Sequence, residues 1–193
     1  VEGSTTVLPV AQKAAEVFMK KNAGVNITIR GGGSGVGISS LIDGTCDIAT
    51  SSRAIKTNEI QKALKKGIDP RGTVIAMDGI AVIVNRANPV SSLTTKQIKD
   101  IYTGAISNWS QVGGSNSRIV VISRDSSSGT FEAFNELALN KAKVTPAALL
   151  QASNQAVVSI TAQTPGAIGY IGMGYISSSV KVVEVDGVNP SVK

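Results

Sequence analysis

The chain has 193 residues, of which 42% are hydrophobic, and it carries a net charge of +6 at pH 7, a balance that favours an anionic partner. A chain of this length can bury a core as one domain or as two small lobes, and no apolar run reaches the roughly 18 residues that a membrane span needs. It contains no histidine and a single cysteine, which excludes a Ser-His triad and an internal disulfide and makes a zinc site improbable, so we predict no catalytic residue, metal or cofactor.

The first half of the chain repeats one unit, a strand followed by a turn rich in Gly, Ser and Thr and then a helix. At the N-terminus the turn "GSTT" precedes a predicted helix over residues 7–21, after a strand of one or two residues. Residues 25–29 predict a strand that leads into the turn "GGGSGVG" and a second helix. The apolar positions of the two helices recur at helical spacing: Val7, Val10, Ala11, Ala14, Val17 and Phe18 in the first, and Ile38, Leu41 and Ile42 in the second.

Four segments follow before the middle of the chain. Residues 46–50 predict a short strand in which Cys46 is a small buried residue rather than a reactive thiol. Residues 53–71 predict an amphipathic helix whose basic face is solvated rather than bound to nucleic acid, since aromatic residues make up only 4% of the chain. Residues 73–77 and 80–85 predict two more strands, and the chain passes into its second lobe at the latter. The predicted lobes are therefore residues 1–79 and 80–193.

In the second half, residues 94–102 predict a helix capped by Thr94 or Thr95. The strand 119–123 leads into "RDSSSGTFEAFNELAL", a third Ser- and Gly-rich turn before a helix. Residues 145–152 predict a helix with Pro146 at its first position, and residues 166–171 and 180–185 predict strands. Trp109 and Tyr170 are interpreted as packing residues. This alternation of strands and helices is typical of an α/β protein with a mainly parallel sheet in each lobe.

The three turns together predict an anion site. A helix N-terminus offers unpaired N–H groups and a partial positive charge, and Ser and Thr add hydroxyl donors. Arg124, at the end of its strand, would supply a full charge. The simpler interpretation is that each turn only caps its own helix. Nucleotide-binding loops are excluded, because "GGGSGVG" has neither the G-x-G-x-x-G register nor a following Lys-Ser/Thr pair.

These segments resemble the phosphate-binding proteins of bacterial phosphate ABC transporters, which are type II periplasmic binding proteins. "GSTTVLPVAQKAAEVF" is similar to the first anion loop and helix of that family, and "GGGSGVGI" is similar to its second loop. "RDSSSGTFEAF" matches the R-x-x-x-S-G-T signature, and "IYTGAISNW" matches a segment without a direct ligand role.

The resemblance implies two lobes with phosphate bound in the cleft between them. It also implies delivery of the phosphate to a membrane permease, a periplasmic or extracellular location and a monomeric chain. No nucleic acid and no membrane insertion are implied. The phosphate ligands it implies are Thr5, Thr6, Ser34, Ser52, Arg124, Ser128, Gly129 and Thr130.

The sequence departs from the family at two places. Ser52 stands where some members have a carboxylate that accepts the proton of hydrogen phosphate and so excludes sulfate. Arg53 beside it either adds charge or faces solvent, and Asp125 either supplies the missing acceptor or orients Arg124. The chain also ends at "VDGVNPSVK", where family members continue with a strand that returns to the first lobe. Either the rest is missing from this chain, or the chain is a minimal version with one crossover, and the first lobe is expected to be short of a strand.

Two alternatives remain open from the sequence. One is a binder of another oxyanion, such as sulfate or molybdate, with the same architecture. The other is an enzyme acting on a phosphorylated substrate, for which Asp125 or Asp47 would have to act as the general base.

Overall fold

A computed structural model describes residues 1–191, and the chain divides into two compact α/β units. The first unit comprises Val1–Met77 together with the short segment Ser126–Gly129. The second comprises Asp78–Asp125 and the chain from Thr130 onward. The sequence prediction placed the division after residue 79 and residues 126–129 in the second lobe. The α/β class agrees with the sequence pattern.

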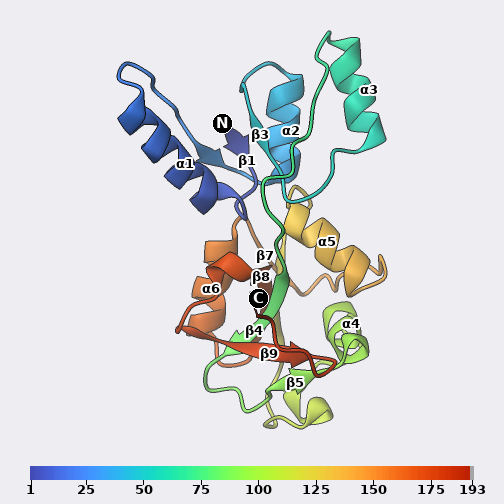
Figure 1. Cartoon of the computed structure of the whole chain (residues 1–193). Coiled ribbons are helices and arrows are strands. Elements are labelled where there is room, and N and C mark those ends of the chain that lie inside the picture. Colours follow the sequence, from blue (N-terminus) through green and yellow to red (C-terminus); the bar gives the residue numbers. More distant parts are fainter. Residues whose placement is uncertain (192–193) are drawn as a thin grey trace. The chain divides into compact units, whose positions relative to one another are not determined.

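The first unit is a small parallel sheet with helices (Figure 1). The strand order is β2-β1-β3, with Glu2 paired to both Arg30 and Ala49. Helix α2 packs beside this sheet and α3, and its buried Ile38 and Ile42 form a core with Ala63. The elements in chain order are β1 (Glu2–Gly3), α1 (Leu8–Lys21), β2 (Arg30–Gly31), α2 (Ser34–Ile42), β3 (Ala49–Thr50) and α3 (Thr57–Lys65).

Two strands predicted for this unit are wrong. Residues 25–29 are not a strand, and β2 contains only the two residues that follow them. Residues 73–77 are also irregular, with Val74, Ile75 and Met77 exposed by 81%, 67% and 91%. A strand needs a neighbour to pair its N–H and C=O groups, and within residues 1–191 no strand pairs with either segment. The apolar residues of these two segments were therefore not sufficient to form a strand.

Helix α1 forms as predicted, but its apolar stripe faces outward. Val10, Val17 and Phe18 are exposed by 54%, 41% and 50%, whereas Ala15 is buried. Pro9 lies in the first turn, where its missing N–H costs no hydrogen bond. The exposed side chains, with Pro9 and Ala14, line a shallow apolar groove along the helix.

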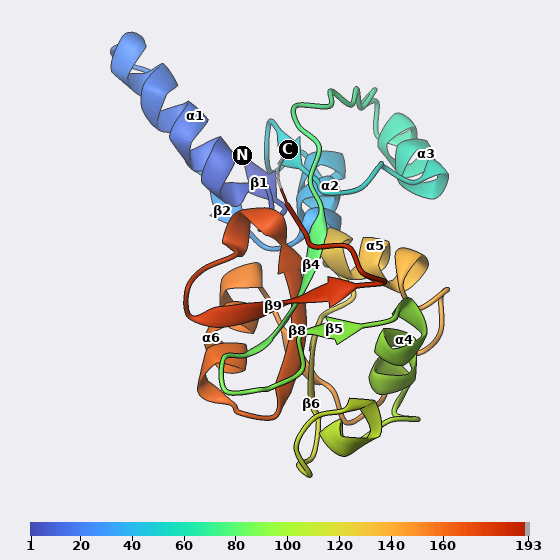
Figure 2. The same ribbon diagram turned by 60° about the horizontal axis from the view of Figure 1, so that its bottom comes forward.

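The second unit contains a six-stranded sheet in the order β5-β9-β4-β8-β6-β7. The sheet is mixed, because β4 runs antiparallel to both β8 and β9 while the other pairs are parallel. Figure 2 shows β9 beside β4 and β5 beyond it. The elements are β4 (Ile80–Asn85), β5 (Ser92–Leu93), α4 (Thr95–Thr103), a 3-10 turn (Trp109–Val112), β6 (Val120–Arg124), α5 (Gly129–Leu137, which starts in the segment grouped with the first unit), β7 (Leu149–Gln151), α6 (Asn154–Gln163), β8 (Ala167–Gly172), a second 3-10 turn (Met173–Tyr175) and β9 (Val180–Val185).

Helices cover both faces of this sheet. Alternate residues of β4 point to opposite faces, as the pleat of a strand requires. Val82 and Val84 pack in the cluster that contains residues of α4 and Phe134 of α5, and Ala81 and Ile83 pack in the cluster with residues of α6. Because β4 is buried on both faces, its sequence is continuously apolar rather than alternating.

Three other predictions for this unit have clear outcomes. Thr94 is the N-cap of α4 and its side chain accepts the N–H of Gln97, as in a capping box. Trp109 is a packing residue, with 1% exposure. The predicted helix over residues 145–152 is wrong, because residues 149–151 form β7 beside β6, and the sequence did not predict α6.

Candidate anion-binding site

In the first unit, the turn before α1 is organised by a buried serine. Ser4 is 2% exposed, and its Oγ accepts the N–H groups of Thr6 and Val7 at 3.2 and 3.4 Å. Thr5, which follows Ser4 in the turn, is also buried, at 5% exposure. The structure therefore holds the predicted turn in a fixed conformation, in which the Thr6 amide donates to Ser4. Contact of Thr5 and Thr6 with an anion stays a prediction.

The start of α2 brings two predicted site residues together. Ser34 is the first residue of the helix and is fully buried. Its Oγ accepts the backbone N–H of Ser52 at 3.0 Å, and the two hydroxyl oxygens lie 3.3 Å apart. Gly33 precedes the helix at a φ of 102°, a left-handed conformation that favours glycine. The two hydroxyls thus sit at a helix N-terminus, where the field of the helix favours negative charge.

The segment Ser126–Gly129 packs against the same helix start. The N–H of Gly35 donates to the Ser127 carbonyl at 2.9 Å, and Ser127 Oγ donates to the Gly32 carbonyl at 3.2 Å. A Cβ placed on Gly129 would lie 2.3 Å from Ser34 Oγ and 2.6 Å from that of Ser52. Three predicted site residues, Ser34, Ser52 and Gly129, are therefore in direct proximity in the first unit. Ser128, which precedes Gly129 in sequence, is buried at 1% exposure.

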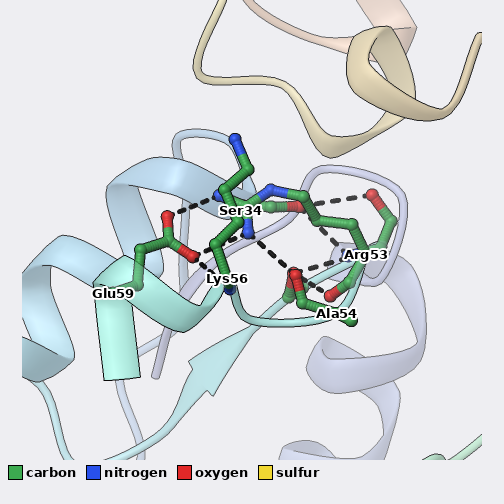
Figure 3. Close-up of polar contacts among 7 residues, drawn as sticks. Ser34, Arg53, Ala54, Lys56 and Glu59 are labelled. Carbon is green, nitrogen blue, oxygen red and sulfur yellow. Dashed lines mark hydrogen bonds and ion pairs between the residues drawn. The ribbon is translucent and has the colours of Figure 1, made fainter. Parts of the chain in front are cut away.

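Arg53 forms a local ion pair (Figure 3). Its guanidinium donates to both carboxylate oxygens of Glu59, from Nη1 at 2.9 Å and from Nη2 at 2.8 Å. Glu59 Oε2 also accepts the N–H of Lys56, and the hydrogen bond from Arg53 lowers the pKa of this carboxyl. The pair has side-chain exposures of 10% and 17%. The charge of Arg53 is thus matched locally, so neither of the two roles considered from the sequence describes it fully.

In the second unit, Arg124 is the last residue of β6 and is 1% exposed. Its Nε donates to the Gln151 carbonyl at 2.9 Å and its Nη2 to the Ala152 carbonyl at 3.0 Å. Its Nη1 is buried and has no hydrogen-bond partner within residues 1–191. Burial lowers the pKa of this guanidinium, while the charge of Asp125 opposes that shift. A buried cation with an unsatisfied donor is costly unless an anion pairs with it.

Tyr170 fixes the backbone from which Arg124 projects. Its Oη accepts the N–H of Arg124 at 3.0 Å and lies 3.0 Å from Ser123 Oγ. The ring stacks on Phe134 of α5, with centroids 3.9 Å apart and an interplanar angle of 7°. Tyr170 is fully buried, so the packing role expected from the sequence is confirmed. Its hydrogen bond to Arg124 had no sequence signal, since the two residues are 46 positions apart.

The buried tyrosines predict a loss of stability at high pH. Burial raises the pKa of Tyr170 to about 12, and it raises the pKa of Tyr102 as well. Tyrosine in the unfolded chain ionises near pH 10, whereas the buried tyrosines resist ionisation. The free energy of unfolding is therefore at its full value below pH 10 and falls as the pH rises toward 12. A shift of this size corresponds to about 3 kcal/mol for Tyr170. Urea unfolding of the second unit, followed from pH 9 to 12, should show this decrease.

The variant Tyr170→Phe tests which group is responsible. It keeps the ring but removes the titration, so its free energy of unfolding should fall less between pH 10 and 12. The matched control is Tyr175→Phe, because Tyr175 is only partly buried and should account for less of the slope. If the free energy of unfolding of Tyr170→Phe falls with pH as steeply as that of wild type, Tyr170 is not the group responsible.

Thr130, the remaining predicted ligand, is the second residue of α5 and is 4% exposed. Across residues 1–191, no three His, Cys, Asp or Glu residues lie together in a way that could hold a metal ion. In the same range, no helix is both long and apolar enough to cross a membrane.

Comparison with known proteins identifies the family. The model of the PBP superfamily domain matches residues 1–191. The chain belongs to the PBP superfamily. Among curated relatives, it is 35% identical over 198 residues to the phosphate-binding protein PstS of Bacillus subtilis, covering 100% of this chain and 63% of the relative. It is likewise 35% identical over 188 residues to PstS of Borreliella burgdorferi, covering 94% of this chain and 65% of the relative.

Solved structures agree with this membership. A Clostridium perfringens protein, described as a phosphate ABC transporter substrate-binding protein and solved with bound phosphate, matches at a TM-score of 0.89 and 40% identity, covering 97% of this chain and 75% of its own. A Vibrio cholerae ABC-type phosphate transport receptor matches at 0.73 and 34% identity, covering 98% and 77%. The chain spans a little less than two thirds of the curated PstS relatives named above.

Proposed function

We propose that this chain is a phosphate-binding component of an ABC transporter and captures inorganic phosphate. The observation that carries the proposal is Arg124, a buried guanidinium whose Nη1 has no partner within the described residues. Hydrogen phosphate supplies the negative charge and the acceptor oxygens that such a group requires. The names of the relatives, and the phosphate bound in the Clostridium perfringens structure, support the same ligand.

The proposed ligand set draws on both units. Ser34, Ser52, Ser128 and Gly129 would donate hydroxyl or amide hydrogens from the start of α2 and from the segment packed against it. Thr5 and Thr6 would donate from the turn before α1, and Arg124 and Thr130 from the second unit. The proximity of Ser34, Ser52 and Gly129 within the first unit supports this set.

The proposed partner is a membrane-embedded permease, and the proposed location is the periplasm or the outer face of the cell membrane. The chain would act as a binding protein and not as an enzyme, and as a monomer. The proposals on partner, location and binding role rest on the family and on the relatives, which are named as phosphate-binding proteins and as transporter components.

A second candidate function is the binding of tetrahedral oxyanions in general. It is favoured by Ser52, whose hydroxyl contacts that of Ser34. A hydroxyl can either donate or accept, whereas a carboxylate can only accept and would repel fully ionised sulfate. A site lined by two serine hydroxyls therefore has less means of rejecting sulfate.

Thermal unfolding of the dialysed chain distinguishes the two functions. Phosphate, sulfate and chloride are added separately at matched ionic strength, and titration calorimetry provides the dissociation constants. A ligand that binds only the native state, present at about one hundred times its dissociation constant, should raise the free energy of unfolding by roughly 2.7 kcal/mol. Stabilisation by phosphate alone is expected. Equal stabilisation by sulfate would establish the general oxyanion binder, and stabilisation by neither anion would overturn both functions.

A further inference from the structure

The guanidinium of Arg124 is held by a turn rather than by an acidic side chain. The turn joins β7 to α6, and its carbonyls at Gln151 and Ala152 accept from Nε and Nη2. These two bonds fix one edge of the planar group. The other edge, which carries the unpartnered Nη1, is thereby given a single direction. The position of the turn decides where that edge points.

Three contacts hold the turn in place. At its start, Gln151 pairs with Arg124 in the ladder between β7 and β6. At its end, Ser153 caps α6 by accepting the N–H of Ala156 at 3.1 Å. Asn154, which is fully buried, ties the turn to β8 because its Oδ1 accepts the N–H of Gly172 at 3.1 Å.

Strand β8 therefore positions both ends of Arg124. Tyr170 of β8 binds the backbone N–H of Arg124, and Gly172 of the same strand anchors the turn that holds its guanidinium. The link through Asn154 comes from a side chain and can be removed by substitution. The carbonyls of Gln151 and Ala152 belong to the backbone and cannot.

We propose that Asn154 is a positioning residue for anion binding, which acts on the ligand through the guanidinium of Arg124. This role rests on the proposed function. When Asn154 is shortened, the turn loses its attachment to β8 and the two carbonyls no longer fix the guanidinium. Part of the binding free energy must then be spent on ordering the arginine. The cost appears in phosphate affinity even though Asn154 itself does not touch the anion.

The same helix offers a matched control at its other end. Asn85 of β4 is 7% exposed, and its Nδ2 donates to the carbonyls of Thr161 and Ala162 at 3.0 and 2.8 Å. It therefore ties the C-terminal end of α6 to the sheet, as Asn154 ties the N-terminal end. Asn85→Ala and Asn154→Ala remove equivalent buried amides, but only the latter adjoins the turn that holds Arg124.

The first experiment compares the phosphate dissociation constants of these two variants by titration calorimetry, with urea unfolding of each as a measure of stability. We expect both variants to lose stability. Asn154→Ala should weaken phosphate binding by about tenfold, the lower end of the range known for residues that orient metal ligands, while Asn85→Ala should stay within about twofold of wild type. Equal affinities in the two variants, or equal losses, would overturn the positioning role.

A double-mutant cycle tests whether the effect passes through Arg124. Arg124→Lys keeps the charge but lacks the fork that the two carbonyls hold. If Asn154 acts by fixing that fork, the double variant Asn154→Ala/Arg124→Lys should bind phosphate about as weakly as Arg124→Lys alone. When Asn85→Ala replaces Asn154→Ala in the cycle, the fold losses of phosphate affinity from the two single substitutions should multiply in the double variant. Multiplicative effects in both cycles would contradict the proposal.

Two further provisions keep the test decisive. If Asn154→Ala does not fold, Asn154→Ser is used, and the hydrogen exchange of the Arg124 Nε–H is followed by NMR without ligand. Exchange should be faster in Asn154→Ser than in wild type and unchanged in Asn85→Ala, and unchanged exchange in Asn154→Ser would overturn the role.

If wild type binds neither phosphate nor sulfate, the proposed function fails as a whole. If wild type binds and only the Asn154 comparison is negative, the positioning role alone fails.

Discussion

Replacing Arg124 by alanine is expected to weaken phosphate binding by at least about 100-fold. The guanidinium is buried, and its Nη1 has no partner within the described residues, so it is placed to form a charge-assisted bond in a desolvated position. Loss of one partner from a buried ion pair costs about 3–5 kcal/mol, and each 1.4 kcal/mol is a factor of ten in the dissociation constant.

The measurement is titration of phosphate into dialysed protein, with Arg86→Ala as the control. Arg86 lies in the same unit, is exposed, and donates to the Ser178 carbonyl, so its removal changes the net charge equally without affecting a buried group. The control should bind like wild type. A dissociation constant for Arg124→Ala within about threefold of wild type would show that this arginine does not hold the anion.

Local signals in the sequence were enough to predict part of the local structure around the candidate site. The turns before α2 and α5 were recognisable from Gly and Ser ahead of a helical pattern, and the cap at Thr94 from the Gln97 three residues later. Arg124 was singled out because it ends an apolar strand at a Ser-rich turn. Each of these inferences used residues within a few positions of one another.

The parts that sequence did not predict depend on distant partners. Residues 73–77 have the pattern of a strand, yet no strand pairs with them in the described chain. The sequence pattern of residues 149–151 predicts the end of a helix, but pairing with β6 makes them a strand. The supports of Arg124 come from Gln151, Ala152 and Tyr170, and no short-range pattern connects these positions to it.

Replacing Gly129 by alanine is expected to weaken phosphate binding, because the new methyl group displaces two candidate ligand hydroxyls. The new Cβ would lie 2.3 Å from Ser34 Oγ and 2.6 Å from Ser52 Oγ, and 3.0 Å from the Ser34 Cβ. Contacts below 3.0 Å cannot persist, so both hydroxyls must move. If each hydroxyl donates to the anion, losing two bonds to a charged group costs about 3 kcal/mol or more, which is at least about 100-fold in affinity.

The comparison variant is Gly72→Ala, in the same unit, where an added Cβ meets no atom within 4 Å. It should leave phosphate affinity unchanged. Gly129→Ala should lose far more phosphate affinity than Gly72→Ala, because the affected hydroxyls form the proposed site. If Gly129→Ala binds phosphate as tightly as Gly72→Ala, Ser34 and Ser52 are not ligands, and the donors to the anion must lie elsewhere in the chain.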